Sequence, residues 1–240
     1  MKWGNLYDHI YVNKLYNMVK RNVSGEIRFV CLTDDPKGLD DEIEIYDCPS
    51  IKIKSPENLL GWRKITLFSS SENLYNLEGT WLYLDLDIVI ISNIDPFFEY
   101  EKDLDFVVMR NWTQPKKLIG NTSVYRFKVG KSLGLLNNLE NSSESILQKY
   151  PNSQTYISRN IESLNFWPEN WCVLFKVNCT RCWPLNFILA PKFPKKSKII
   201  AFPGVPNPHQ AYEGKWPTKA SWKRIYKYIK ATRWIEDYWR

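Results

Sequence analysis

Two carboxylates, separated by a single residue, stand inside a long apolar stretch of the chain. Asp85 and Asp87 follow Trp81-Leu82-Tyr83-Leu84 and precede Ile88-Val89-Ile90-Ile91. Alternate residues of a strand point to the same side, so a strand over residues 81–91 would project both carboxylates together. Adjacent buried carboxylates repel each other and require a cation or a proton. The pattern therefore predicts a divalent cation, Mg²⁺ or Mn²⁺, that bridges these carboxylates to the phosphates of a substrate.

Two other interpretations of the Asp pair remain open. The pair could form a structural ion pair with Arg63 or Lys64, although one cation does not satisfy two carboxylates. An apolar strand followed by Asp-x-Asp also fits the nucleophile and acid partner of a haloacid-dehalogenase-type phosphatase. That motif normally opens its domain, whereas 84 residues precede it here, and the expected Thr or Val is displaced to Val89.

Hydrophobic periodicity predicts helices that alternate with strands. The pattern indicates helices over residues 8–22, 61–69, 130–150 and 154–164, and strands over 27–32, 43–46, 81–91, 105–109, 123–127 and 198–202. This alternation is typical of an α/β domain with a mostly parallel sheet flanked by helices. Ligands of such sheets bind beyond the carboxyl ends of the strands, and the Asp pair lies near one such end.

The C-terminal segment is basic and aromatic. Residues 191–240 hold 12 Lys and Arg against 3 Asp and Glu, a balance of +9 in a chain whose net charge is +7. We predict a domain over residues 1–214 and an extension over 215–240, whose helix begins near residue 219 and carries Trp222, Tyr226 and Trp234 at helical spacing. Such a helix would pack on the domain or contact an anionic membrane surface. No groove-reading motif accompanies the charge, so we expect no nucleic-acid partner.

Composition narrows the class of protein further. The chain has 240 residues, of which 15% are aromatic, enough to form a full core. No apolar run reaches the roughly 18–20 residues of a membrane span, and no signal-peptide core is present at the N-terminus. We therefore expect a cytoplasmic protein, peripheral at the inner membrane face if the extension binds lipid. The five cysteines are scattered, and the single Cys179-x-x-Cys182 pair indicates reduced thiols rather than a zinc site.

The order and spacing of several short segments resemble a bacterial family of nucleotide-sugar glycosyltransferases. The family is of the GT-A type and is related to glycosyltransferase family 8. The segments that carry the resemblance span nearly the whole chain: Lys2-Trp3-Gly4, residues 11–16 (YVNKLY), residues 29–35 (FVCLTDD), residues 61–64 (GWRK), residues 82–87 (LYLDLD), residues 95–98 (DPFF), residues 120–124 (GNTSV), residues 154–158 (QTYIS) and residues 166–168 (FWP).

The resemblance implies a GT-A fold and a metal-dependent transfer of a hexose-type sugar. The donor would be a nucleotide sugar, UDP-linked, and the acceptor a glycan or lipid-linked molecule of cell-surface polysaccharide biosynthesis. A Mn²⁺ or Mg²⁺ ion would stabilise the diphosphate leaving group. A catalytically weak or inactive family member, which binds a sugar nucleotide or a partner protein, is the alternative.

The resemblance also implies roles for individual residues. Asp85 and Asp87 match the metal-binding Asp-x-Asp motif, and Asp85 also faces the donor. Asn121 matches a residue that binds the donor sugar, and Gln154 matches a residue close to the anomeric carbon; these two are the implied catalytic residues. The remaining implied donor-binding residues are Asn5 and Tyr7 at the base, with Lys64 and Ser153 near the sugar nucleotide.

Three positions depart from the family pattern. Ser153 stands where the family carries Asp, and Pro203 stands where a Phe-His-Gly segment supplies a third metal ligand. His209, six residues further on, is the expected substitute ligand. The chain also begins at Lys2-Trp3-Gly4, where the family has nearly completed its first strand, a departure that would remove most of that strand and its nucleotide-binding backbone.

Overall fold

The computed structural model describes residues 1–53, 61–114, 116–218, 222 and 226–240. Their contacts form two compact units, each assembled from segments that are distant in sequence. Unit 1 consists of Met1–His9, Arg28–Leu84 and Phe97–Trp167, and unit 2 consists of Ile10–Ile27, Asp85–Pro96 and Pro168–Arg240. The predicted boundary at residue 214 stays a prediction.

Unit 1 is built on a four-stranded sheet with the order β3-β6-β5-β7. The long β6 (Gly120–Lys128) pairs antiparallel with β3 (Thr80–Leu84) and β5 (Phe106–Arg110), and β5 pairs parallel with β7 (Asn165–Phe166). Most residues of β5 and β6 are buried, as expected for strands that are covered on both faces. A separate parallel pair joins β1 (Val30–Thr33) to β2 (Glu44–Asp47).

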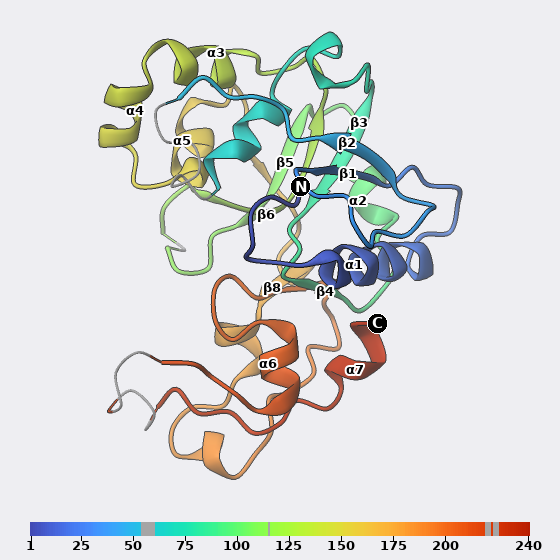
Figure 1. The fold of residues 1–240 in the computed structure, drawn as a ribbon. Coiled ribbons are helices and arrows are strands. Elements are labelled where there is room, and N and C mark those ends of the chain that lie inside the picture. Colours follow the sequence, from blue (N-terminus) through green and yellow to red (C-terminus); the bar gives the residue numbers. More distant parts are fainter. Residues whose placement is uncertain (54–60, 115, 219–221, 223–225) are drawn as a thin grey trace. The chain divides into compact units, whose positions relative to one another are not determined.

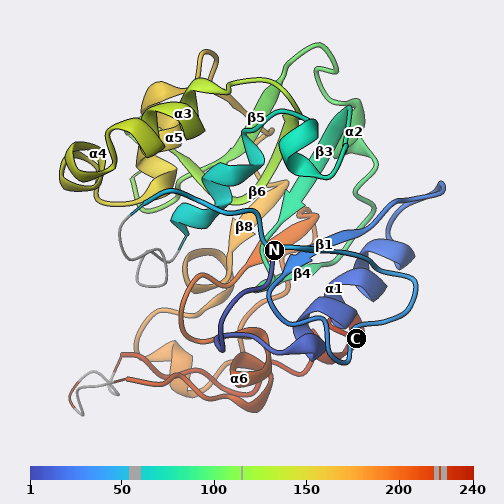
Figure 2. The same cartoon turned by 45° about the horizontal axis from the view of Figure 1, so that its top comes forward.

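Helices and aromatic rings complete unit 1. The helical elements are η2 (Trp62–Leu67), η3 (Glu72–Leu74), α2 (Pro96–Glu99), α3 (Gly134–Asn141), α4 (Ser143–Lys149) and α5 (Ser153–Asn160). Figures 1 and 2 show α3 and α5 side by side, and the Tyr156 hydroxyl of α5 donates to the Leu135 carbonyl of α3 over 2.8 Å. Tyr125 of β6 stacks on Tyr83 with ring centroids 4.7 Å apart and also packs on Phe68, so the core is largely aromatic.

Unit 2 contains a three-stranded sheet with the order β4-β9-β8. In it β9 (Ile199–Ala201) pairs antiparallel with β4 (Ile88–Ile90) and parallel with β8 (Cys172–Leu174), and all three strands are buried. Met18 of α1 (His9–Arg21) accepts a hydrogen bond from the Ile90 N–H through its sulfur. The other helical elements are the π-helix η4 (Phe175–Cys179), η5 (Leu185–Phe187), α6 (Pro208–Glu213) and α7 (Ile235–Tyr238).

The predicted α/β class is confirmed, and several predicted elements require correction. Strand pairing within the described residues is mixed rather than mostly parallel, because parallel and antiparallel pairs occur in both larger sheets. The predicted helix over residues 130–150 is two helices that meet at Ser142, whose φ of −137° and ψ of 35° are not helical. The predicted helix over residues 61–69 is the 3-10 helix η2. The predictions missed β7, β8 and α6, which are short.

The predicted C-terminal helix is wrong in the described part of that segment, where the last helix covers only Ile235–Tyr238. Residues 226–234 are not helical, and positions 219–221 and 223–225 lie outside the described residues. Tertiary contacts replace the helix: the Thr232 N–H donates to the Ala211 carbonyl over 3.0 Å, and Ile229 and Thr232 are buried. Within the described residues, no helix has the length and apolar composition needed to cross a bilayer.

The cysteines are free thiols, and most of them are shielded from water. Burial raises the pKa of Cys48 to about 11 and that of Cys179 to about 12. Cys182, the other member of the CxxC segment, is exposed. Its raised pKa keeps the buried Cys179 thiol protonated at neutral pH.

Candidate functional site

The Asp pair occupies a turn. The chain leaves β3 after Leu84 and enters β4 at Ile88, so Asp85, Leu86 and Asp87 connect strands that belong to different sheets. The prediction of one strand over residues 81–91 is therefore wrong, and the two carboxylates do not share a strand face. Asp87 is 8% exposed, whereas Asp85 is half-buried. The chain changes sheets here because β3 pairs with β6 while β4 pairs with β9.

The ends of three strands meet beside Asp87 in unit 2. The Phe202 N–H, just after β9, donates to the Asp87 carbonyl over 2.8 Å, which extends the β4–β9 pairing by one residue. Because β8 runs parallel to β9, the residues after β8 reach the same sheet edge. Phe175 stacks on Phe202 with centroids 4.5 Å apart, and the Lys176 ammonium donates to the Pro203 carbonyl.

Lys176 is half-buried, and its surroundings perturb its ionisation. Burial lowers the pKa of Lys176 below its ordinary value, the charge of Lys227 lowers it further, and the carboxylate of Asp87 opposes the shift. The ammonium also lies 3.7 Å from where a side-chain carbon on Gly204 would stand. Lys176 was not predicted as a site residue, because it follows the short strand β8, which hydrophobic periodicity did not reveal.

His209 is engaged elsewhere in unit 2. Its Nδ1 lies 2.6 Å from the Tyr11 hydroxyl, and its ring packs against Trp239. Among the described residues, no group of three His, Cys, Asp or Glu side chains is arranged to hold a metal ion. At Asp85 and Asp87 the chain can therefore offer a cation two carboxylates, and water or phosphate oxygens would have to supply the other positions, as is usual for Mg²⁺.

Unit 1 brings Lys64 close to the start of β6. Lys64 lies on η2, is 9% exposed, and donates from Nζ to the Thr122 carbonyl over 3.2 Å. Its ammonium also lies 5.2 Å from the centre of the Tyr83 ring. Asn121, the neighbour of Thr122, accepts from the Ser123 N–H through Oδ1 over 2.9 Å. Two of the predicted donor-binding residues, Lys64 and Asn121, are thus held by adjoining segments.

The N-terminus of α5 lies close to this region. Asn152 caps α5 by accepting from the Thr155 N–H over 2.9 Å. Ser158, one turn after Gln154, donates to the Gln154 carbonyl and accepts from the Gly120 N–H, which fixes α5 to the start of β6. Neither Asn152 nor Ser158 was predicted to be a positioning residue, although an Asn before a helix is a usual cap signal.

The first turn of α5 also approaches η2. The buried Ser153 hydroxyl lies 3.3 Å from the position of a side-chain carbon on Gly61, whose φ of +85° and close neighbour both favour glycine. The predicted residues Lys64, Asn121, Ser153 and Gln154 therefore lie on three segments of unit 1 that contact one another.

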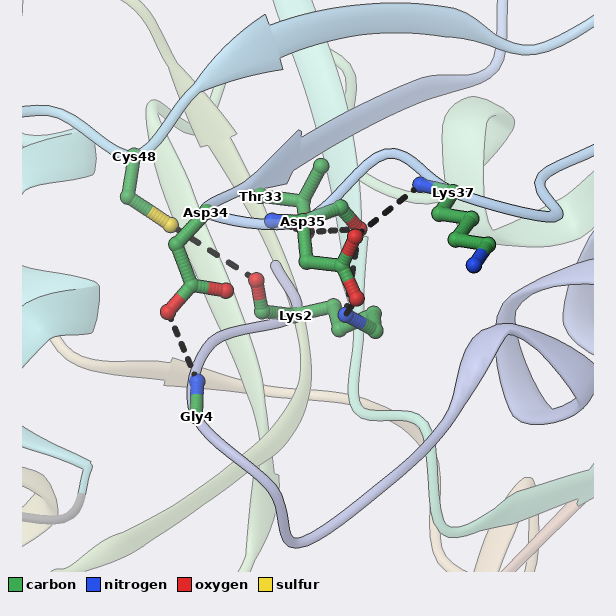
Figure 3. A network of polar contacts seen from close by, with 7 residues as sticks. All are labelled: Lys2, Gly4, Thr33, Asp34, Asp35, Lys37 and Cys48. Carbon is green, nitrogen blue, oxygen red and sulfur yellow. Dashed lines mark hydrogen bonds and ion pairs between the residues drawn. The ribbon is translucent and has the colours of Figure 1, made fainter.

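A polar network anchors the N-terminal segment that carries Asn5 and Tyr7 (Figure 3). The Gly4 N–H donates to the Asp34 carboxylate over 2.8 Å, and Lys2 binds Asp35 through both its carbonyl and its carboxylate. Lys2 also pairs with Thr33 in a parallel bridge, with its N–H 2.8 Å from the Leu32 carbonyl. Asn5 and Tyr7 follow directly after this anchored segment. Asn5 is exposed and Tyr7 is half-buried.

Comparison with known proteins identifies the fold. No protein-family model and no curated protein matches the chain. The galactosyltransferase LgtC, solved with donor and acceptor sugar analogues, is 13% identical with a TM-score of 0.55 over 83% of this chain and 85% of LgtC. An active-site mutant of LgtC is also 13% identical, with a TM-score of 0.57 over 90% of this chain and 95% of the mutant chain. The bifunctional glycosyltransferase WbbM is 12% identical, with a TM-score of 0.52 over 83% of this chain and 44% of WbbM. The chain therefore has the GT-A-type α/β fold of glycosyltransferases.

Proposed function

We propose that this protein transfers a hexose-type sugar from a UDP-linked donor to a glycan or lipid-linked acceptor of cell-surface polysaccharide biosynthesis. The observation that carries the proposal is the likeness of the fold to glycosyltransferases over most of the chain. The positions of the chemistry-bearing residues agree with it. Unit 1 holds amide, hydroxyl and ammonium groups on contacting segments, and in unit 2 the Asp87 carboxylate lies close to the Lys176 ammonium.

Unit 1 supplies polar groups suited to binding a sugar. Asn121 offers an amide nitrogen to a sugar hydroxyl, and Gln154 presents a neutral amide close to the reacting carbon. Lys64 is held by a backbone carbonyl and a ring, so its charge is fixed in place. Fixed polar groups lower the barrier because they need no reorganisation as charge develops in the transition state.

Asp85 and Asp87 are the proposed ligands of a Mn²⁺ or Mg²⁺ ion. When bound, such an ion would neutralise the negative charge that develops on the diphosphate leaving group. His209 is not included in this proposal, because Tyr11 and Trp239 engage its ring. Ser153 keeps a supporting role, because its hydroxyl packs against Gly61 beside η2.

The direct test measures release of UDP from a panel of UDP-hexoses by the purified chain with Mn²⁺, with and without an acceptor extract. We expect release above the buffer rate for one donor. A chain that binds UDP without turning over any donor would instead support the alternative, a sugar-nucleotide-binding protein without catalysis. That alternative is motivated by two departures from the family that the sequence resembles: Ser153 stands in place of an Asp, and Pro203 stands in place of a His.

Contact with a membrane surface is a second proposal. A patch of exposed aromatic and aliphatic side chains supports it, in place of the predicted C-terminal helix. Phe187 stacks on Tyr228 with centroids 4.8 Å apart, and Lys230 donates to the Ile188 carbonyl, so residues 183–189 and 226–230 adjoin. We call the exposed apolar residues of these segments, together with Trp222, the aromatic patch: Trp183, Leu185, Phe187, Ile188, Leu189, Trp222, Tyr226 and Tyr228. Exposed Trp and Tyr beside Lys suit the interface of an anionic bilayer, where a lipid-linked acceptor would lie.

A further inference from the structure

Three segments of unit 2 place a lysine at the sheet edge that begins with Asp87. Asp87 precedes β4, Pro203 follows β9 by one residue, and Lys176 follows β8 on the π-helix η4. The backbone bond from Phe202 to Asp87 and the bond from the Lys176 ammonium to Pro203 hold these segments together. A side chain that is bound to backbone at its tip has already lost much of its conformational freedom, so its charge is fixed.

The charges around Lys176 favour an anion. Lys227 lies close enough to act electrostatically on Lys176, and two neighbouring ammonium groups repel each other unless an anion lies near them. Asp87 offsets part of this repulsion, but one carboxylate does not neutralise two ammonium groups. An ammonium has three N–H donors, and the Pro203 carbonyl accepts from one of them. The arrangement therefore suits a multiply charged oxyanion.

Gly204 also lies at this edge, next to the Lys176 ammonium. Gly204 adopts a φ of +70°, and a side-chain carbon there would lie 3.7 Å from the Lys176 nitrogen. Pro203 has no ionisable side chain, so it adds no charged group that could bind the Lys176 ammonium in place of an anion. Proline at position 203 thus removes the metal ligand that the family pattern predicts. Lys176 is then the fixed positive charge at this edge.

We propose that Lys176 is an anion-binding residue that holds the diphosphate of the donor, so that nucleotide binding persists when divalent cations are removed. This inference rests on the proposed function, because it assigns the diphosphate of a nucleotide sugar as the anion. A cation at Asp85 and Asp87 would add to the affinity, whereas Lys176 supplies the part that does not depend on metal.

Calorimetric titration with UDP in EDTA and in Mn²⁺ tests the proposal. We expect the wild-type chain to bind UDP in both buffers. Lys176→Met should weaken binding in EDTA about 10- to 100-fold, the loss expected for a charge-assisted hydrogen bond, and Lys176→Arg should retain most of it. Lys198→Met is the matched control, because Lys198 is also a half-buried lysine of unit 2 that donates to a backbone carbonyl, that of Asn93.

A labelling experiment on the wild-type chain keeps the test independent of variant folding. UDP or pyrophosphate in EDTA should protect Lys176, but not Lys198, from acetylation detected by mass spectrometry, whereas uridine should protect neither. Binding that requires Mn²⁺, with Lys176 unprotected in EDTA or with Lys176→Met equal to wild type, would overturn this inference and leave the proposed function intact. Absence of UDP binding in either buffer would count against both.

Discussion

The backbone N–H of Phe202 donates to the backbone carbonyl of Asp87 over 2.8 Å, one residue beyond the Ile88–Ala201 pair of β4 and β9. This bond places the second carboxylate of the Asp-x-Asp segment beside the residues that follow β9. The sheet, and not the turn alone, thereby holds the backbone of Asp87 in place. The carboxylate consequently lies in the same electrostatic environment as the Lys176 ammonium.

Replacing Asp87 by Asn should separate the metal-dependent part of nucleotide binding from the metal-independent part. We expect Asp87→Asn to lose the enhancement of UDP affinity by Mn²⁺, about 10-fold or more, because a neutral amide is a poor ligand for a hard cation. In EDTA the variant should bind UDP at least as well as wild type, since a negative charge near the diphosphate has been removed. Calorimetry in both buffers gives the two values.

Asp95→Asn is the control for this experiment, because Asp95 is a half-buried carboxylate of unit 2 that accepts from Ser24 and Asn93. It should behave as wild type toward UDP. An Mn²⁺ enhancement that survives in Asp87→Asn would show that the carboxylate does not bind the ion.

Replacing the buried Arg126 by Met should destabilise unit 1 strongly. Arg126 is fully buried, and its guanidinium donates to a set of backbone carbonyls at the end of α2 and in the turn after it, those of Phe97, Phe98, Tyr100, Glu101 and Leu104. Met leaves these acceptors without their donor, and we expect a loss of about 3 kcal/mol or more in the free energy of unfolding. Urea denaturation followed by tryptophan fluorescence measures it.

Arg110→Met is the matched control for Arg126. Arg110 lies on β5 of the same sheet, and its guanidinium lies 4.2 Å from the centre of the Phe166 ring, which is a cation–π contact. Its loss should cost about 1 kcal/mol. Equal losses of unfolding free energy in the two variants would contradict the role assigned to the hydrogen bonds from Arg126 to the backbone carbonyls.

Replacing Tyr156 by Phe should change how stability depends on alkaline pH. Burial raises the pKa of Tyr156 to about 12, and the nearby Tyr150 adds to the shift. The unfolded chain has an ordinary Tyr pKa near 10, so it releases this proton first. Stability contributed by neutral Tyr156 is therefore complete below pH 10 and is lost as pH rises toward 12.

At pH 8 the wild type should exceed Tyr156→Phe by about 1 kcal/mol, because the hydroxyl donates to the Leu135 carbonyl. By pH 11 that advantage should largely vanish, since ionisation in the unfolded state then favours unfolding of the wild type by about 1 kcal/mol. Urea denaturation at the two pH values compares the chains. A constant difference between them would mean that Tyr156 titrates alike in both states.

The aromatic patch should bind anionic lipid. Trp183 is 63% exposed and Ile188 66% exposed, so replacing both by Ser removes apolar area without disturbing the core. We expect sedimentation with phosphatidylglycerol vesicles to weaken about 10-fold in this variant and to weaken with salt in every variant. Leu118→Ser in unit 1 alters a residue of similar exposure, 62%, and should sediment as wild type. Equal sedimentation of all three chains would argue against the patch.

Local sequence patterns were sufficient for the longer elements. The helix predicted over residues 8–22 corresponds to α1 (His9–Arg21), which has a clear helical period, and the strand over 105–109 corresponds to β5 (Phe106–Arg110), which is a short continuous apolar run. The predicted helix at the C-terminus failed for the opposite reason. Its spacing was helical, but contacts such as Thr232 with Ala211 hold the described part of the segment in another conformation. Tertiary contacts routinely override weak local propensity.

The sequence by itself determined which residue types were available for chemistry: two carboxylates one residue apart, an amide at Asn121 and another at Gln154, and the α/β class in which they occur. Only the tertiary structure decided that the Asp pair lies in a turn between two sheets, and that Lys176 stands beside Asp87. The physical reason is that strand pairing joins segments more than eighty residues apart, and periodicity within a single segment carries no information about its partner strand.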